Sequence, residues 1–210
     1  RERSWEDWLD AVKRGYEILS PHVDSICILG FSTGGILSLL CAAEQPQKLT
    51  GLIVINPPVK FKNKNMKFVP LLHGVSRLAR LAPSLEGLMN YRSNDTEHPR
   101  INYRNMPVRG LYELVRMNNM LDGKLDSIDI PCLLMQATND PVVEADSSQI
   151  LKDGLINADV SYVEVESRRH GILYEDEGNT HEIVINYIQQ LFDALTDQTY
   201  SYKEKQQWAS

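Results

Sequence analysis

Residues 30–34, Gly30-Phe31-Ser32-Thr33-Gly34, carry the strongest indication of how this chain folds. The short apolar run before it, residues 25–29, suits a buried strand, and residues 34–44 are rich in Leu and Ala and suit a helix that ends before Pro46. The glycines at positions 30 and 34 would let the chain turn sharply and bring the strand and helix close together. The pattern therefore predicts a serine exposed at the tip of a strand–turn–helix unit.

The same alternation of strand and helix continues through most of the chain. Further buried strands are predicted over residues 52–55, 132–137 and 160–165, and helices over residues 5–19, 147–156 and 183–192. Short apolar strands that alternate with helices favour an α/β fold, with a mostly parallel sheet flanked by helices on both faces.

The segment 57–120 interrupts this alternation and is too long for a plain crossover. We interpret it as an inserted cap. The chain then divides into a first core part at 1–56, the cap at 57–120, a second core part at 121–195 and a polar, loosely held tail at 196–210.

Composition excludes several classes of protein. The net charge of −6 argues against nucleic acid as a partner. No apolar run approaches the roughly 20 residues that span a bilayer. The three cysteines lie in apolar segments and fit buried, reduced thiols of a cytoplasmic protein. Neither a metal nor a cofactor is expected, because no Cys or His pair has ligand spacing and the glycines near Ser32 do not form a phosphate-binding loop.

A serine hydroxyl becomes a useful nucleophile only beside a base, which a third group orients, and near amides that bind an oxyanion. Ser32 has candidates for each role. His170 follows the predicted strand 160–165, Asp140 follows the strand 132–137, and the amide of Thr33 lies at a helix N-terminus. Since the carboxyl ends of parallel strands meet at one edge of a sheet, we predict that Ser32, His170 and Asp140 lie together.

Other residues remain alternatives to this set. Asp140 also suits a plain turn before Pro141, and Glu144 and Asp146 are fallback acids near the start of the next helix. The other histidines fit the base less well, because they precede the nucleophile strand, lie in the insertion or begin the last helix: His22, His73, His98 and His181.

The run 30–35, the segment 136–143 and the His170 loop resemble the α/β-hydrolase superfamily. The resemblance is closest to bacterial carboxylesterases and monoacylglycerol lipases, which group with the serine aminopeptidase-like hydrolases, and it covers about residues 4–194. It implies that Ser32 is the nucleophile, His170 the base, Asp140 its orienting acid and Thr33 an oxyanion amide. It also implies that the insertion 57–120 is a cap that shapes the acyl pocket. Apolar residues between 71 and 88 are candidates for lining that pocket, and core packing beneath the cap is the alternative.

The resemblance implies a serine hydrolase that cleaves carboxylic esters, either small molecules or monoacylglycerol-like lipids, through an acyl-serine intermediate. A thioesterase or peptidase of the same fold is an alternative. So is a non-catalytic binding module, because the early strands of such hydrolases, and the loop that gives a second oxyanion donor, are absent from these 210 residues. Loss of one such donor typically lowers the rate about 10²- to 10³-fold. We therefore expect one of two situations. Either an N-terminal segment outside this chain supplies the second oxyanion donor, or the chain is an incomplete hydrolase.

The predicted cap differs in charge from the rest of the chain. Residues 57–109 carry ten Lys and Arg against three acids, whereas the whole chain has a net charge of −6. Such a basic cap could draw anionic substrates or give weak contact with a membrane surface, and an ordinary solvated face is the alternative.

Overall fold

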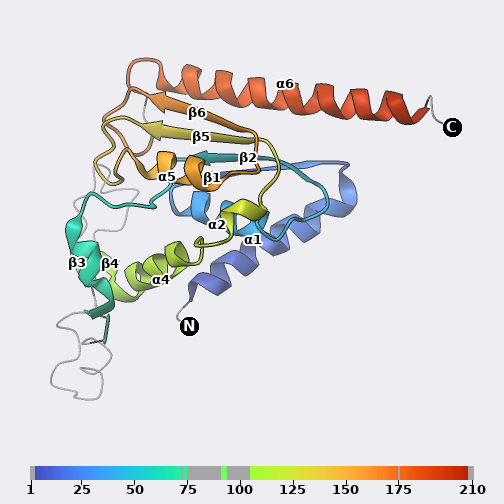
Figure 1. Cartoon of the computed structure of the whole chain (residues 1–210). Helices are drawn as coiled ribbons and strands as arrows, with labels where there is room; N and C mark the ends of the chain where they lie inside the picture. Colours follow the sequence, from blue (N-terminus) through green and yellow to red (C-terminus); the bar gives the residue numbers. More distant parts are fainter. Residues whose placement is uncertain (1–2, 72, 75–90, 94–104, 175, 208–210) are drawn as a thin grey trace.

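The computed structural model describes residues 3–71, 73–74, 91–93, 105–174 and 176–207 (Figure 1). The helices are α1 Trp5–Leu19, α2 Thr33–Ala42, α4 Val108–Asn119, α5 Ser147–Gly154 and α6 Thr180–Gln207. The strands are β1 Ile26–Phe31, β2 Leu49–Ile55, β3 Tyr91–Ser93, β4 Asn105–Pro107, β5 Cys132–Ala137 and β6 Val160–Val165. Short 3-10 helices cover Ser20–His22, Lys64–Phe68 and Leu125–Ser127.

Four strands form one sheet in the order β1-β2-β5-β6, and each neighbouring pair is parallel. The two central strands are almost continuously apolar, as expected where helices cover both faces. The predicted α/β fold with a parallel sheet is therefore confirmed.

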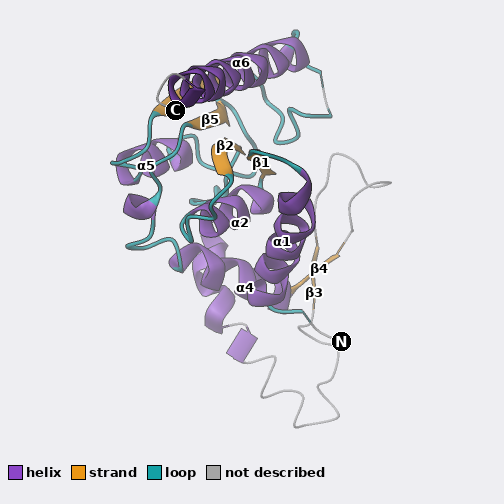
Figure 2. Cartoon of the chain, turned by 90° about the vertical axis from the view of Figure 1, so that its right-hand side faces the viewer, coloured by secondary structure: helices purple, strands orange, loops and turns teal. Residues whose placement is uncertain are grey.

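Helices α1, α2 and α4 lie on one face of the sheet and α6 lies on the other (Figures 1 and 2). Two apolar clusters correspond to these faces, one built around Leu39, Leu52 and Leu134 and the other around Ile53 and Met135. Helix α1 begins with a capping box in which Ser4 and Asp7 bond to each other's backbone amides.

The part of the predicted cap that the structure describes includes a two-stranded β3–β4 ribbon and helix α4. Helix α4 packs against α1 and α2, and its Met117 is fully buried in the core cluster on that side. Val69 is also buried, whereas Leu71 is 67% exposed. The other leucines predicted to line a pocket lie outside the described residues, and the domain boundaries remain predictions.

The segment predicted as a polar, loosely held tail continues α6 as far as Gln207, so the last helix extends well beyond the predicted residues 183–192, and how loosely this segment is held stays a prediction. Residues 196–207 contain no Gly or Pro and end in the good helix formers Lys203-Glu204-Lys205-Gln206-Gln207. Once α6 is nucleated on the sheet, adding such residues requires no new nucleation.

Strand β1 lies at an edge of the sheet and pairs only with β2 among the described residues. On the α6 side of β1, Cys27 and Phe31 are only partly buried and Leu29 is 45% exposed. No helix in the described part of the chain combines the length and apolar character needed to cross a bilayer.

Candidate active site

Ser32 occupies a strained turn between β1 and α2. Its backbone has φ 52° and ψ −124°, a conformation that is costly for a residue with a side chain. Its N–H donates to the carbonyl of Ile55 at the end of the neighbouring strand, at 2.9 Å. The turn therefore ends β1 sharply and places Ser32 immediately before the first turn of α2.

Gly30 makes this turn possible because it lies against α2. A Cβ built on Gly30 would come within 2.3 Å of the Gly34 carbonyl oxygen and 2.5 Å of the Ser38 hydroxyl. A Cβ on Gly34 would meet nothing within 4 Å. The prediction that a glycine is needed for the strand and helix to approach closely is thus confirmed at Gly30. It is wrong at Gly34, where only the backbone carbonyl takes part in the contact.

The structure brings together the three side chains that the sequence predicts to meet. His170 Nε2 lies 2.9 Å from Ser32 Oγ, and His170 Nδ1 lies 2.6 Å from Asp140 Oδ2. Asp140 is buried, and its Oδ1 accepts the N–H groups of Val142 and Val143 at 2.7 and 2.9 Å. Such a chain can move a proton from the serine hydroxyl to the imidazole while the carboxylate holds the imidazole in place.

The three residues meet because each follows the carboxyl end of a parallel strand. Ser32 follows β1, Asp140 follows β5 and His170 follows β6. The Asp140 and His170 loops also bond to each other, since Asn139 N–H donates to the carbonyl of Ser167 at 3.0 Å. Glu177 braces the His170 loop by accepting the N–H of Arg168 at 2.8 Å and the hydroxyl of Ser167 at 3.3 Å.

The alternative acids make other contacts. Asp146 pairs with Lys60 at 2.6 Å, and the backbone of Glu144 bonds to the Lys60 carbonyl. Of the other histidines, His73 stacks on Tyr112 and the backbone of His181 bonds to Asp176 at the start of α6. His22 lies in the 3-10 helix that precedes β1, and His98 lies outside the described residues.

Thr33 is the first residue of α2, where backbone N–H groups have no partner within the helix. This position is compatible with the predicted role of its amide as an oxyanion donor, which stays a prediction.

Sequence reasoning missed three residues around this set. The Phe31 ring centroid lies 5.1 Å from that of His170, and Tyr174 meets Phe31 edge-on at 6.2 Å. Asn56, the first residue after β2, donates to the His170 carbonyl. Phe31 occupies one of the two variable positions of the turn motif and Asn56 directly follows a predicted strand, so the sequence position of each gave only a weak signal of its role.

The thiols are poor competitors for Ser32 as nucleophile. Burial raises the pKa of Cys27 to about 11 and that of Cys132 to about 12, and burial also raises the pKa of Cys41. Within the described residues, no three His, Cys, Asp or Glu side chains are grouped so that they could hold a metal ion.

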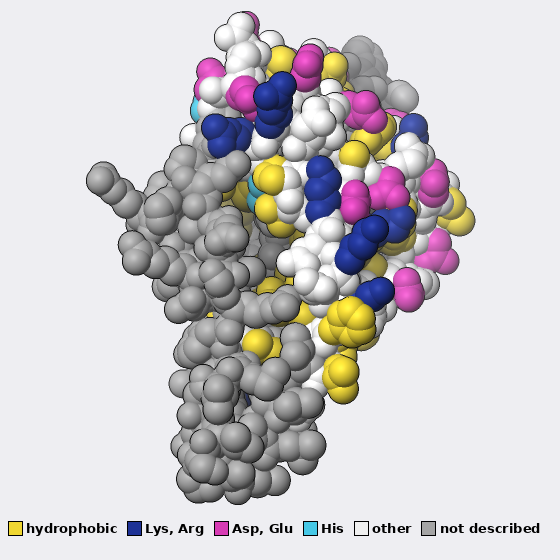
Figure 3. Space-filling model, turned by 90° about the vertical axis from the view of Figure 1, so that its left-hand side faces the viewer, with side chains coloured by type: hydrophobic (Ala, Val, Ile, Leu, Met, Phe, Trp, Pro, Cys, Tyr) yellow, Lys and Arg dark blue, Asp and Glu magenta, His cyan; other side chains and the backbone are white. Residues whose placement is uncertain are grey.

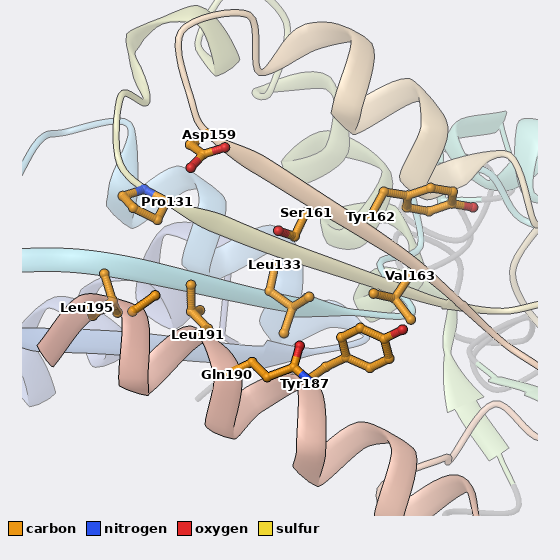
Figure 4. A pocket seen from close by; sticks show the side chains of 11 residues that line it. Pro131, Leu133, Asp159, Ser161, Tyr162, Val163, Tyr187, Gln190, Leu191 and Leu195 are labelled. Atoms are coloured by element: carbon orange, nitrogen blue, oxygen red, sulfur yellow. The ribbon is translucent and has the colours of Figure 1, made fainter. Parts of the chain in front are cut away.

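A separate hollow of about 410 Å³ lies between α6 and strands β5 and β6 (Figure 4). Pro131 and Asp159, which immediately precede these strands, are among its lining residues. Because Ser32, Asp140 and His170 follow the opposite, carboxyl ends of the strands, this hollow is not part of their site.

The described part of the face in Figure 3 does not present a field of one charge sign. Lys60, Lys62, Lys64 and Lys67 are exposed, but Lys60 is paired with Asp146. Basic and acidic side chains are interspersed on the described part of the face in Figure 3.

Comparison with known proteins identifies a family that this chain matches. Residues 3–177 match the family described as serine aminopeptidase, S33. The chain is 25% identical over 170 residues to a thermostable monoacylglycerol lipase of Bacillus sp. (strain H-257), a match that covers 80% of this chain and 63% of the relative. It is 26% identical over 188 residues to a carboxylesterase of Bacillus subtilis (strain 168), covering 89% of this chain and 73% of the relative.

The fold is also similar to that of solved lipolytic enzymes. A metagenome-derived lipolytic enzyme superposes with a TM-score of 0.74 at 16% identity, covering 91% of this chain and 74% of the other. At this identity the match shows the α/β-hydrolase fold alone. The chain thus spans less than two thirds of the length of the Bacillus lipase and about three quarters of the other two proteins.

Proposed function

Because the chain belongs to the serine aminopeptidase S33 family, we propose that it is the catalytic part of a serine hydrolase that cleaves carboxylic esters. The observation that carries the proposal is the continuous hydrogen-bonded path from Ser32 Oγ through His170 to Asp140. The names of the two curated relatives, a monoacylglycerol lipase and a carboxylesterase, favour acyl esters or monoacylglycerol-like lipids as substrates.

In the proposed first half-reaction, Ser32 Oγ attacks the ester carbonyl carbon while His170 Nε2 takes the hydroxyl proton. The carbonyl π electrons move onto oxygen, and the resulting oxyanion is bound by the Thr33 amide. When the tetrahedral intermediate collapses, the C–O bond to the alcohol breaks and His170 gives its proton to the departing oxygen. The acyl group is then bonded to Ser32.

In the second half-reaction a water molecule replaces the alcohol. The water oxygen attacks the carbonyl carbon of the acyl-serine while His170 takes one proton from the water. His170 then gives this proton to Ser32 Oγ as the C–O bond to serine breaks and the acid leaves. Asp140 accepts the Nδ1–H of His170 throughout, which leaves Nε2 free as the base and stabilises the imidazolium that forms.

The alternatives differ in how well the geometry supports them. A non-catalytic module does not need Ser32 and His170 within hydrogen-bond reach, and their separation of 2.9 Å therefore supports the enzyme. A thioesterase or peptidase would use the same path, so a choice among ester, thioester and amide depends on substrates. Weak contact of residues 57–109 with an anionic membrane surface remains a secondary proposal, supported by their excess of Lys and Arg.

A fluorophosphonate probe, which phosphonylates activated serines, tests the proposal on the full-length protein. We expect wild type to be labelled and Ser32→Ala to be unlabelled. Ser161→Ala, which removes an exposed serine hydroxyl near the opposite end of the sheet, is the matched control and should label like wild type. Equal labelling of wild type and Ser32→Ala would contradict the assignment of the nucleophile.

Matched substrates test the bond that is cleaved. We expect p-nitrophenyl esters of medium and long acyl chains to be hydrolysed faster than the corresponding thioesters and aminoacyl p-nitroanilides. Faster cleavage of the anilides would favour the peptidase alternative.

A further inference from the structure

We propose that Asn56 is a positioning residue that holds the His170 backbone so that the imidazole reaches both Ser32 and Asp140. The inference rests on the proposed function, because it concerns the same reaction. Within the part of the chain that the structure describes, Asn56 forms no hydrogen bond with Ser32 Oγ or with the Asp140 carboxylate, so it would act through His170.

Asn56 follows β2, and its backbone N–H and both polar atoms of its side chain bond to neighbouring parts of the site. The partners are in β5, which precedes the Asp140 loop, and in the His170 loop. Its backbone N–H donates to the Met135 carbonyl at 2.9 Å, and its Oδ1 accepts the N–H of Ala137 at 2.7 Å. Its Nδ2 donates to the His170 carbonyl at 2.6 Å. The residue is completely buried, so loss of one partner would leave a polar group without water to replace it.

The backbone of Asn56 is also unusual. Its φ of 47° lies in the left-handed region, which Asn tolerates better than most residues with a side chain. This conformation follows the end of β2 just before Pro57, and the side-chain amide there bonds to the backbone of Ala137 and of His170. The position therefore combines a backbone conformation and two side-chain bonds that Asn can provide together.

The place of Asn56 in the sheet explains why it can align the site. Strand β2 lies between β1 and β5, and the carbonyl of Ile55 accepts the N–H of Ser32. Ile55, the last residue of β2, and Asn56, which follows it, thus bond to the nucleophile, to the end of the strand that precedes Asp140, and to the base. Ala137 is three residues before Asp140, so the Asn56 amide joins the acid strand directly to the backbone of His170.

Two substitutions separate the bonds. Asn56→Asp keeps an oxygen to accept from Ala137 but loses the donor to the His170 carbonyl. Asn56→Gly removes both bonds while keeping a residue that adopts positive φ without strain. Asn179→Gly is the matched control, because Asn179 also has positive φ, at 66°, but lies exposed before α6.

The readouts are the rate of fluorophosphonate labelling, the division between kcat and KM on an ester, and the NMR signal of the His170 Nδ1–H proton. We expect both Asn56 variants to lose about 10- to 10²-fold in labelling rate and in kcat, since small misplacements of a reacting group have effects of this size. KM should change little, and the Nδ1–H signal should shift or broaden. Asn179→Gly should match wild type in all three.

Wild-type labelling and an unchanged Nδ1–H signal in Asn56→Asp would overturn the inference, because the bond to His170 would then be dispensable. A loss of activity that matches only the fraction of unfolded protein, measured by circular dichroism, would also overturn it. Ser32→Ala is assayed beside these variants: if it labels like wild type, the proposed function itself fails, whereas an inactive Ser32→Ala beside fully active Asn56 variants refutes only the role of Asn56.

Discussion

At the scale of single residues, the two glycines of the motif around Ser32 differ in how much space a side chain would have. Gly30→Ala would drive a methyl group into the Gly34 carbonyl, and backbone cannot move aside as a flexible side chain can. We expect a loss of about 1–3 kcal/mol in the free energy of unfolding, as for other overpacked sites. Gly34→Ala has open space and lies within α2, so it should be neutral or stabilise by up to about 1 kcal/mol. Urea denaturation of the two variants and wild type measures this difference; equal losses would contradict it.

The residues of the candidate site were predictable to the extent that their signals are local. Ser32 lies in a five-residue motif, and Asp140 and His170 each follow a strand that the apolar pattern shows. Asn56 has no comparable local signal, because its side-chain bonds reach across 81 residues to Ala137 and 114 residues to His170. Such bonds depend on strand order, which the apolar pattern does not specify.

At the scale of elements, the loop between β6 and α6 holds His170, and Glu177 is one of its anchors. The N–H of Arg168 lowers the pKa of Glu177 below its ordinary value of 4.5, and the Ser167 hydroxyl contributes to the same shift. Because the folded pKa is the lower one, the stabilising contribution is fully present above about pH 4.5 and is lost as the pH falls through the folded pKa.

We therefore expect Glu177→Gln to have a lower Tm than wild type at neutral pH, with the difference shrinking as the pH falls below 4.5. Thermal unfolding monitored by circular dichroism across that range measures it. Glu166→Gln removes the same charge from an exposed position in the same loop and is the control. A difference between Glu177→Gln and wild type that is constant with pH would show that the carboxylate does not brace the loop.

Two strands were predicted to the residue, for different reasons. Strand β5 matches the predicted residues 132–137 and is buried along its whole length, whereas β6 matches 160–165 with apolar residues that alternate with polar ones. The predicted strand 52–55 begins three residues too late, because Leu49-Thr50-Gly51 pairs with β1 despite its weak apolar pattern. The end of α6 was missed for a different reason: polar helix formers look like a tail unless a preceding packed helix can propagate into them.

At the scale of the whole molecule, the sheet is covered unevenly. Helix α6 packs on β2 and β6, while β1 has one edge without a partner strand among the described residues and an exposed Leu29 on the α6 side. Exposed strand edges readily pair with further chain. The sequence leaves two alternatives for the second oxyanion donor, a segment outside these 210 residues or an incomplete hydrolase. For the first alternative, the edge of β1 beside Ser32 is the place where such a segment would reach the site.

If that segment covers β1, Leu29 changes from half-exposed in residues 1–210 to buried in the longer protein. Leu29→Glu should then lower the free energy of unfolding of the longer protein by at least about 2 kcal/mol, since it removes a buried Leu and adds an unpaired charge. In residues 1–210 alone the change should stay within about 0.5 kcal/mol, as at other surface positions. Ile156→Glu, at a position that is 71% exposed beyond α5, should have a small effect in both forms. Denaturation of both forms gives the comparison, and an equally small effect of Leu29→Glu in each would mean that β1 stays uncovered and that the second donor must reach Ser32 by another route.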